Sequence, residues 1–174
     1  MPTLLTPVIA DFMESGEVSV YAAACDAQLR PIATRAFGCG VARERRAVTT
    51  WIARPSAPRL LDDVAGNGRL ALVVSHIDSC KTLQLKAVDA RVEDPDPSDH
   101  ARIAAYHDAF IAQAIRMGYP EAMLRSMLQF RFDELAAIVF TPVAVFAQTP
   151  GPGAGAPVAD LADEGAPSES TSDR

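Results

Sequence analysis

The sequence over Lys81–Val92 reads KTLQLKAVDARV, and the spacing of its apolar residues decides the fold. Leu83 and Leu85 lie on one side of an extended chain, whereas Val88 begins an apolar set on the opposite parity. A one-residue change of register of this kind is what a β-bulge produces, and we place one near Lys86–Ala87. Because bulges bend strands, this stretch predicts a long strand that curves around a barrel.

Other β-rich runs lie on both sides of this strand, and most follow one another without an intervening helix. Strands in direct succession predict antiparallel neighbours, whereas a doubly wound parallel sheet would need a helix after nearly every strand. A closed barrel would also remove exposed strand edges. Pro142 in the last run predicts an edge position or a second bulge. The other five predicted strands are Val18–Cys25, Pro31–Cys39, Arg46–Ala53, Arg69–His76 and Ala137–Ala147.

Four helices are predicted from capping residues and apolar stripes. The first begins at Pro7 after a Thr6 cap and stops before Gly16. The others span about 58–65, 97–117 and 120–129. The sequence therefore predicts an α+β protein that is mainly β: a six-stranded antiparallel barrel with flanking helices.

Composition and charge limit the partners and the compartment. The formal net charge is −6, but residues 149–174 carry five of the acids and one base, so residues 1–148 are nearly neutral. A nearly neutral body predicts neither nucleic acid nor a membrane as a partner. Three cysteines without metal-type spacing favour reduced thiols and a cytoplasmic protein, and no metal site is expected. We expect a domain over residues 1–148 and a disordered acidic tail, rich in Pro, Gly and Ser, over residues 149–174.

Two polar features are candidates for a ligand site. The chain has only two lysines, Lys81 and Lys86, and Thr82 and Gln84 alternate with leucines between them. Such a polar strand face suits the ring edge or phosphate of a ligand, although a solvent-facing strand has the same pattern. Arg35 lies among apolar residues of a strand, and arginine binds phosphate well, although it too could face outward.

The order of several short motifs is more informative than any one of them. A turn and a strand-borne arginine follow the first helix, then come a threonine pair, a short helix that leads to an asparagine and an apolar strand, and a basic residue before Thr-Leu-Gln-Leu. Over about residues 6–152 this order resembles the pyridoxamine 5'-phosphate oxidase-like split barrel. The motifs are Asp26–Pro31 with Arg35, Thr49–Trp51, Leu60–Val64, Asn67–Leu72, Lys81–Leu85 and Phe146–Pro152.

The resemblance implies a homodimer with FMN at the subunit interface and a small-molecule substrate. It would assign the phosphate to Arg35 and Arg59, with Arg54 as a competitor of Arg59. It would place Thr49 and Thr50 at the phosphate or ribityl chain. The residues expected near the flavin or the partner subunit are Lys81, Thr82 and Gln84.

The chain also departs from the family pattern. Gly40 stands where the full oxidases have a lysine, so one phosphate cation is missing, and Ala87 replaces a common glycine. A deazaflavin or haem is therefore an alternative to FMN. The leading hypothesis is an FMN-dependent oxidoreductase with no catalytic side chain of its own. The alternatives are a non-catalytic flavin or haem carrier or sensor, and a structural dimer that has lost its ligand.

Overall fold

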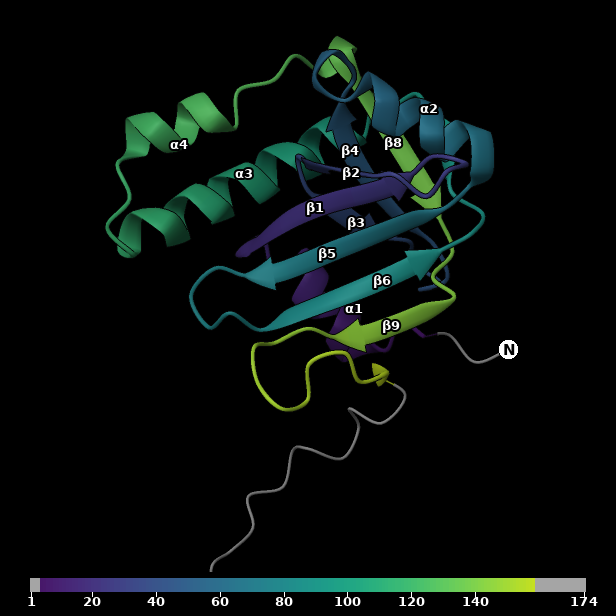
Figure 1. Ribbon diagram of the computed structural model, residues 1–174. Coiled ribbons are helices and arrows are strands. Elements are labelled where there is room, and N and C mark those ends of the chain that lie inside the picture. The colour runs from purple at the N-terminus through teal and green to yellow at the C-terminus, as the bar shows by residue number, and fades with distance from the viewer. Residues whose placement is uncertain (1–3, 159–174) are drawn as a thin grey trace, which may run out of the picture.

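The computed structural model describes residues 4–158, whose strands form two antiparallel sheets with helices around them (Figure 1). The five-stranded sheet has the order β2-β1-β5-β6-β9, and the four-stranded sheet has the order β3-β4-β8-β7. The strands of the first sheet are β1 (Val18–Cys25), β2 (Pro31–Arg35), β5 (Leu70–His76), β6 (Thr82–Ala87) and β9 (Ala144–Ala147). Those of the second are β3 (Cys39–Val41), β4 (Val48–Ala53), β7 (Arg91–Glu93) and β8 (Leu135–Phe140).

The described residues thus contain nine strands where six were expected, because three of the predicted runs are divided between the two sheets. The run around Lys81–Val92 breaks after Ala87, close to the predicted bulge, and continues as β7. The last run breaks around Pro142, so that β8 and β9 lie in different sheets. The second run bends at Gly38, whose φ of 117° is one that L side chains rarely adopt. The α+β class and the antiparallel pairing are confirmed.

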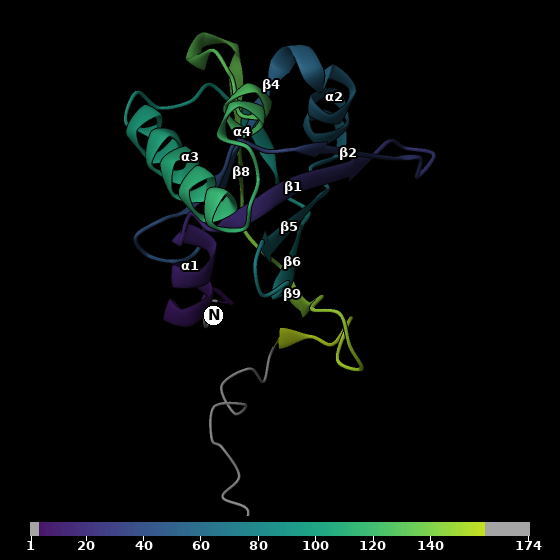
Figure 2. The same ribbon diagram turned by 90° about the vertical axis from the view of Figure 1, so that its left-hand side faces the viewer.

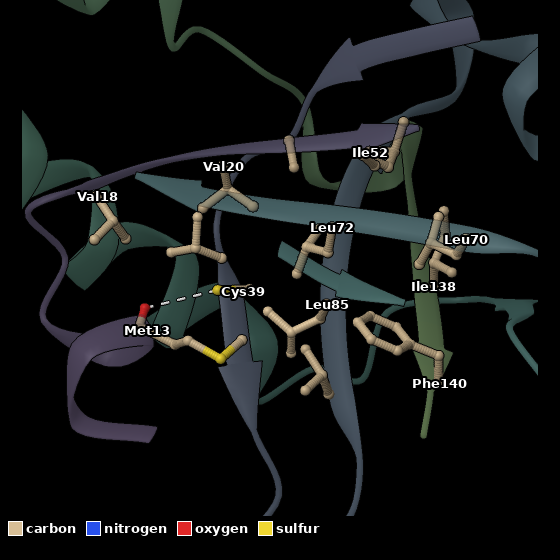
Figure 3. Packing of buried hydrophobic residues seen from close by; sticks show 14 of the residues in the cluster. Met13, Val18, Val20, Cys39, Ile52, Leu70, Leu72, Leu85, Ile138 and Phe140 are labelled. Atoms are coloured by element: carbon tan, nitrogen blue, oxygen red, sulfur yellow. Dashed lines mark hydrogen bonds between the residues drawn. The ribbon is translucent and has the colours of Figure 1, made fainter. Parts of the chain in front are cut away.

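The core lies between the inner faces of the two sheets. Val20, Leu72 and Leu85 of the five-stranded sheet face Ile138 and Phe140 of the four-stranded sheet, and all five are nearly inaccessible to solvent (Figure 3). Burial of this apolar surface is the main force that holds the sheets together.

One end of this core is closed by α1 (Pro7–Glu14), as its Met13 packs next to Cys39 of β3. The buried Cys39 thiol donates to the Met13 carbonyl oxygen at 3.6 Å, and burial raises its pKa to about 12. This cysteine is therefore a structural thiol.

The helices lie at the ends and along one side of the two packed sheets. α2 (Pro58–Asn67) packs on β1 and β2, whereas α3 (Asp99–Arg116) and α4 (Glu121–Met127) form a layer on one side (Figure 2). Two short 3₁₀ turns cover Arg54–Ser56 and Phe132–Glu134. Over residues 4–158 no helix is both long and apolar enough to span a membrane.

The chain continues to pack beyond Gln148. The Gly155 N–H donates to the Ala147 carbonyl at 2.7 Å, and the Ala147 N–H donates to the Ala156 carbonyl at 2.9 Å. Val158 packs against the main core. The segment expected to be a tail therefore begins with a return along β9, and its remainder, residues 159–174, lies outside the described part.

Candidate functional site

The outer face of the five-stranded sheet carries a row of paired side chains. Arg35 pairs with Tyr21, Tyr21 with Val73, Val73 with Gln84, and Gln84 with Phe146. Cross-strand partners point to the same side of a sheet, so these five side chains share one face. In Figures 1 and 2, α3 and α4 lie beside the β1–β2 end of this sheet, whereas β6 and β9 have no helix over their outer side in the described part of the chain. From β2 to β6 the row spans three strand spacings, about 14 Å.

Arg35 at the end of β2 is held by aromatic side chains. Its Nη1 donates to the Tyr21 hydroxyl at 3.4 Å, and its Cζ lies 4.8 Å from the centre of the Phe110 ring of α3. Its Nε and Nη2 are buried without a hydrogen-bond partner, and no carboxylate pairs with it in residues 4–158. A half-buried guanidinium without a counter-ion is suited to an anionic ligand, because buried charges are normally paired.

Thr82 and Gln84 share the outer face with Arg35. The Thr82 hydroxyl is 2.7 Å from the Ser75 hydroxyl, and the Gln84 carboxamide oxygen accepts from Gln148 Nε2 at 3.3 Å. Both side chains are half-buried. Of the predicted site residues, Arg35, Thr82 and Gln84 therefore lie together on the outer face of the five-stranded sheet within a single chain.

Lys81 directly precedes β6 and has the opposite parity to Thr82 and Gln84, so its side chain leaves the other side of the chain. Its ammonium group is 5.7 Å from the centre of the Phe12 ring of α1, and its side chain is exposed. Lys86, further along β6, lies over the Phe146 ring at 5.1 Å. Both lysines therefore contribute positive charge at the two ends of β6.

The threonine pair lies in the other sheet. Thr50 is fully buried between the sheets, where its hydroxyl donates to the Gly38 carbonyl at 2.8 Å. Thr49 has the opposite parity and pairs with Gly40 and Val139. The Thr50 hydroxyl therefore stabilises the bend at Gly38. Of the two threonines, only Thr49 points away from the core.

Arg59 and Arg54 are engaged at other places. Arg59, near the start of α2, donates to the Arg30 carbonyl at 3.1 Å and lies 3.7 Å from carboxylate oxygens of Asp26 and Asp63. Arg30 directly precedes β2 and Arg35 ends it, so the two are five residues apart, about 17 Å along an extended chain. Arg59 and Arg35 are therefore not brought together within one chain.

Arg54 is tied to the β7–β8 end of the second sheet. Its Nε donates to the Leu135 carbonyl at 3.0 Å, and its Nη2 lies 2.7 Å from Asp94 Oδ1. Both Arg54 and Arg59 thus already have carboxylate and carbonyl partners. The structure therefore favours neither of them as the second phosphate ligand.

Gly40 has an unexpected neighbour in α3. A Cβ atom at position 40 would overlap the guanidinium of Arg102. That guanidinium lies 3.0 Å from Glu14 and 3.8 Å from Asp99, and it packs 5.6 Å from the centre of the Trp51 ring. A cation does lie at the position of the missing lysine, but acidic side chains already pair with it.

The α3 side of the site was not predicted from the sequence. The Phe110 ring covers Arg35, and the buried His107 imidazole follows the same helical face. Burial, and then the Arg35 charge, lower the pKa of His107 to about 4. The i, i+3 spacing of these two residues predicted a common stripe, but no local pattern indicates which strand a helical stripe will meet.

Some of the described residues suit a ligand that has both an anionic group and a polar ring. Arg35 suits an anionic group, and the polar Thr82 and Gln84 on the same face suit hydrogen-bonding ring atoms. Thr50 and Arg59 do not extend this set, because both already bind main-chain carbonyls. Within residues 4–158 no group of three or more His, Cys, Asp or Glu side chains is arranged to hold a metal ion.

Solved structures share this fold at low sequence identity. HupZ of Group A Streptococcus is similar over 87% of this chain and 100% of its own, with a TM-score of 0.53 and 12% identity. A predicted pyridoxamine 5'-phosphate oxidase of Lactobacillus delbrueckii is similar over 84% and 100%, with a TM-score of 0.50 and 17% identity. A conserved hypothetical protein of Mycobacterium tuberculosis is similar over 83% and 85%, with a TM-score of 0.50 and 12% identity.

By sequence, no family model matches the chain, and no curated protein matches it. The resemblance to pyridoxamine 5'-phosphate oxidase-like split barrels is therefore confirmed at the level of the fold.

Proposed function

We propose that this split-barrel chain binds FMN as a homodimer and is an oxidoreductase that acts on a small molecule. The observation that carries the proposal is the state of Arg35. Its guanidinium is fixed by Tyr21 and Phe110, and two of its nitrogens are buried without an acceptor. A phosphate would supply the missing acceptor and the counter-ion together.

The chain's own residues would bind and orient the cofactor. Arg35 would hold the phosphate at the edge of the sheet, and Thr82 and Gln84 would offer hydrogen-bonding groups to the ring about three strands away. Lys81 would add positive charge beyond Thr82. When bound, a flavin itself supplies the redox chemistry, so no side chain needs to act as a nucleophile or base.

A second copy of the chain would cover the outer face of the five-stranded sheet. The middle of this face carries small or uncharged side chains, such as Ala23 on β1 and Val73 on β5, with Arg35 on the edge strand β2 and Lys86 near the end of β6. Interfaces exclude charged residues from their centres in the same way. A ligand that begins at Arg35 and extends along this face would then lie between two subunits.

The second candidate is a non-catalytic carrier or sensor of a flavin, a deazaflavin or haem. The pairing of Arg102 favours it, because the cation beside Gly40 is shared with Glu14 and Asp99 and leaves Arg35 to hold the phosphate. Reoxidation of a reduced nicotinamide with an artificial electron acceptor, in the presence of bound FMN, would favour the enzyme over the carrier.

The phosphate assignment is tested by comparing FMN with riboflavin, which lacks the phosphate. In Arg35→Ala we expect FMN binding to weaken by about 1.5–3 kcal/mol, the range for a charge-assisted hydrogen bond, while riboflavin binding stays the same. Arg30→Ala, at the other end of β2, is the matched control and should leave both affinities unchanged. Equal FMN affinity in Arg35→Ala and wild type, with an intact fold, would remove Arg35 from the site.

A further inference from the structure

Helix α3 brings a second nitrogen-bearing side chain to the anion site. We propose that His107 completes the site of Arg35 and that its Nε2–H donates a hydrogen bond to the same phosphate. This inference rests on the proposed function, because it takes the FMN phosphate as the anion. It adds a residue of the inserted helix to a site that the strands alone were expected to form.

The first support is the burial of His107. The residue is 8% exposed, and its Nε2 is buried without a hydrogen-bond partner. Its ring packs 5.9 Å from the Phe37 ring, 5.6 Å from the Tyr106 ring and 5.0 Å from the Phe130 ring, measured between centres. Aromatic neighbours on three sides fix the imidazole, and a buried polar nitrogen without a partner is costly. An acceptor from a ligand would remove that cost.

The second support is the position of His107 beside Arg35. Phe37 follows Arg35 by two residues along the bend between β2 and β3, and its ring contacts His107. Phe110, one turn after His107 on α3, covers the Arg35 guanidinium at 4.8 Å. His107 thus shares its immediate surroundings with Arg35, and it lies near enough for the Arg35 charge to act on its imidazole.

The charges around the pair favour a neutral donor. The charges that act on His107 are those of Arg35 in β2, which lowers its pKa, and of Asp108 in α3 itself, which raises it, and Tyr106 is a titratable neighbour. Burial and the Arg35 charge keep the imidazole neutral at neutral pH. A neutral imidazole donates through one nitrogen and adds no second positive charge beside Arg35.

The test measures FMN and riboflavin dissociation constants by flavin fluorescence for wild type, His107→Phe and His107→Gln. His107→Phe keeps an aromatic ring but removes the donor, so we expect FMN affinity to fall about tenfold and riboflavin affinity to stay unchanged. The side-chain amide of His107→Gln can donate from a similar position and should recover most of the loss. His100→Phe is the matched control on the same helix, since its ring packs on Phe132, 5.3 Å away.

The outcomes separate this inference from the proposed function. Equal FMN affinity in wild type and a folded His107→Phe would overturn the role of His107, even if Arg35→Ala still loses FMN. Equal affinity of the wild type for FMN and riboflavin would instead overturn the phosphate assignment itself.

Inorganic phosphate gives a readout that does not need a flavin. We expect it to raise the melting temperature of wild type and of His107→Gln more than that of His107→Phe. An equal shift in all three proteins, or no shift in wild type, would contradict the proposed anion site of Arg35 and His107.

Discussion

Arg102 of α3 fills the space that a side chain at Gly40 of β3 would need. The arginine reaches this position from a helix more than sixty residues further along the chain, and Glu14 of α1 anchors it at 3.0 Å. The position at which the full pyridoxamine 5'-phosphate oxidases have a lysine is therefore occupied here by a cation that also joins α1, β3 and α3. This relationship changes what restoring the lysine would do.

Gly40→Lys should destabilise the protein rather than improve FMN binding. The new side chain would displace the Arg102 guanidinium, and overpacking of this kind costs about 1–3 kcal/mol. Urea unfolding of the single variant and of Gly40→Lys combined with Arg102→Ala would test this. The double variant should recover part of the stability, because it removes the group that the lysine displaces. A single variant as stable as wild type would show that Arg102 is not held in this place.

Thr50 should matter for stability and not for the cofactor. Thr50→Val removes the buried hydrogen bond to the Gly38 carbonyl, which should lower the free energy of unfolding by about 1 kcal/mol without a change in FMN affinity. Thr49→Val is the matched control, because its side chain points away from the core. Loss of FMN affinity in Thr50→Val alone would return this threonine to the binding site.

A charge in the middle of the outer sheet face should separate the proposed dimer. Val73 lies in the row between Tyr21 and Gln84, so Val73→Asp would place two carboxylates in a symmetric interface. We expect the dimer to weaken by about 100-fold or more in sedimentation experiments. Val88→Asp, at an exposed position between β6 and β7, is the control. An unchanged dimer in Val73→Asp would mean that copies meet through another surface.

Acid should destabilise the protein through His107. Its pKa is lowered to about 4, so the folded state disfavours the protonated imidazole, and the unfolded chain binds the proton first as the pH falls. This contribution is fully present above about pH 6.5 and is lost as the pH falls toward 4, with about 3 kcal/mol as its upper limit.

The measurement is urea unfolding of wild type and His107→Phe at neutral pH and near pH 4.5. The difference between the two pH values should be smaller for His107→Phe, whereas His100→Phe should behave as wild type does. The same acid loss in all three proteins would show that other groups cause it.

The sequence predicted the elements well and the site only in part. Alternation along Lys81–Val92 predicted a bulge where the structure has the break between β6 and β7, because a buried strand must keep one parity facing the core. The same alternation placed Thr82 and Gln84 on one face, which the sheet register confirms. Pro142 likewise marked the break between β8 and β9.

Contacts made by the inserted helix could not be predicted in this way. Nothing local in the sequence indicates that Arg102 lies on Gly40 or that His107 and Phe110 lie beside Arg35, because these contacts depend on how α3 docks. Thr50 was assigned from a resemblance between motifs, and that resemblance does not show on which face its hydroxyl lies. The side-chain parity of β4 answers that question only when the sheet is known.

The most direct test of the flavin proposal is an absorbance spectrum of the purified protein after incubation with FMN and removal of free FMN by gel filtration. We expect the visible flavin bands to stay with the protein, at about one FMN per chain of a dimer. A colourless protein that retains no FMN would contradict the proposed flavin site, and a Soret band in the protein as isolated would assign the site to haem instead.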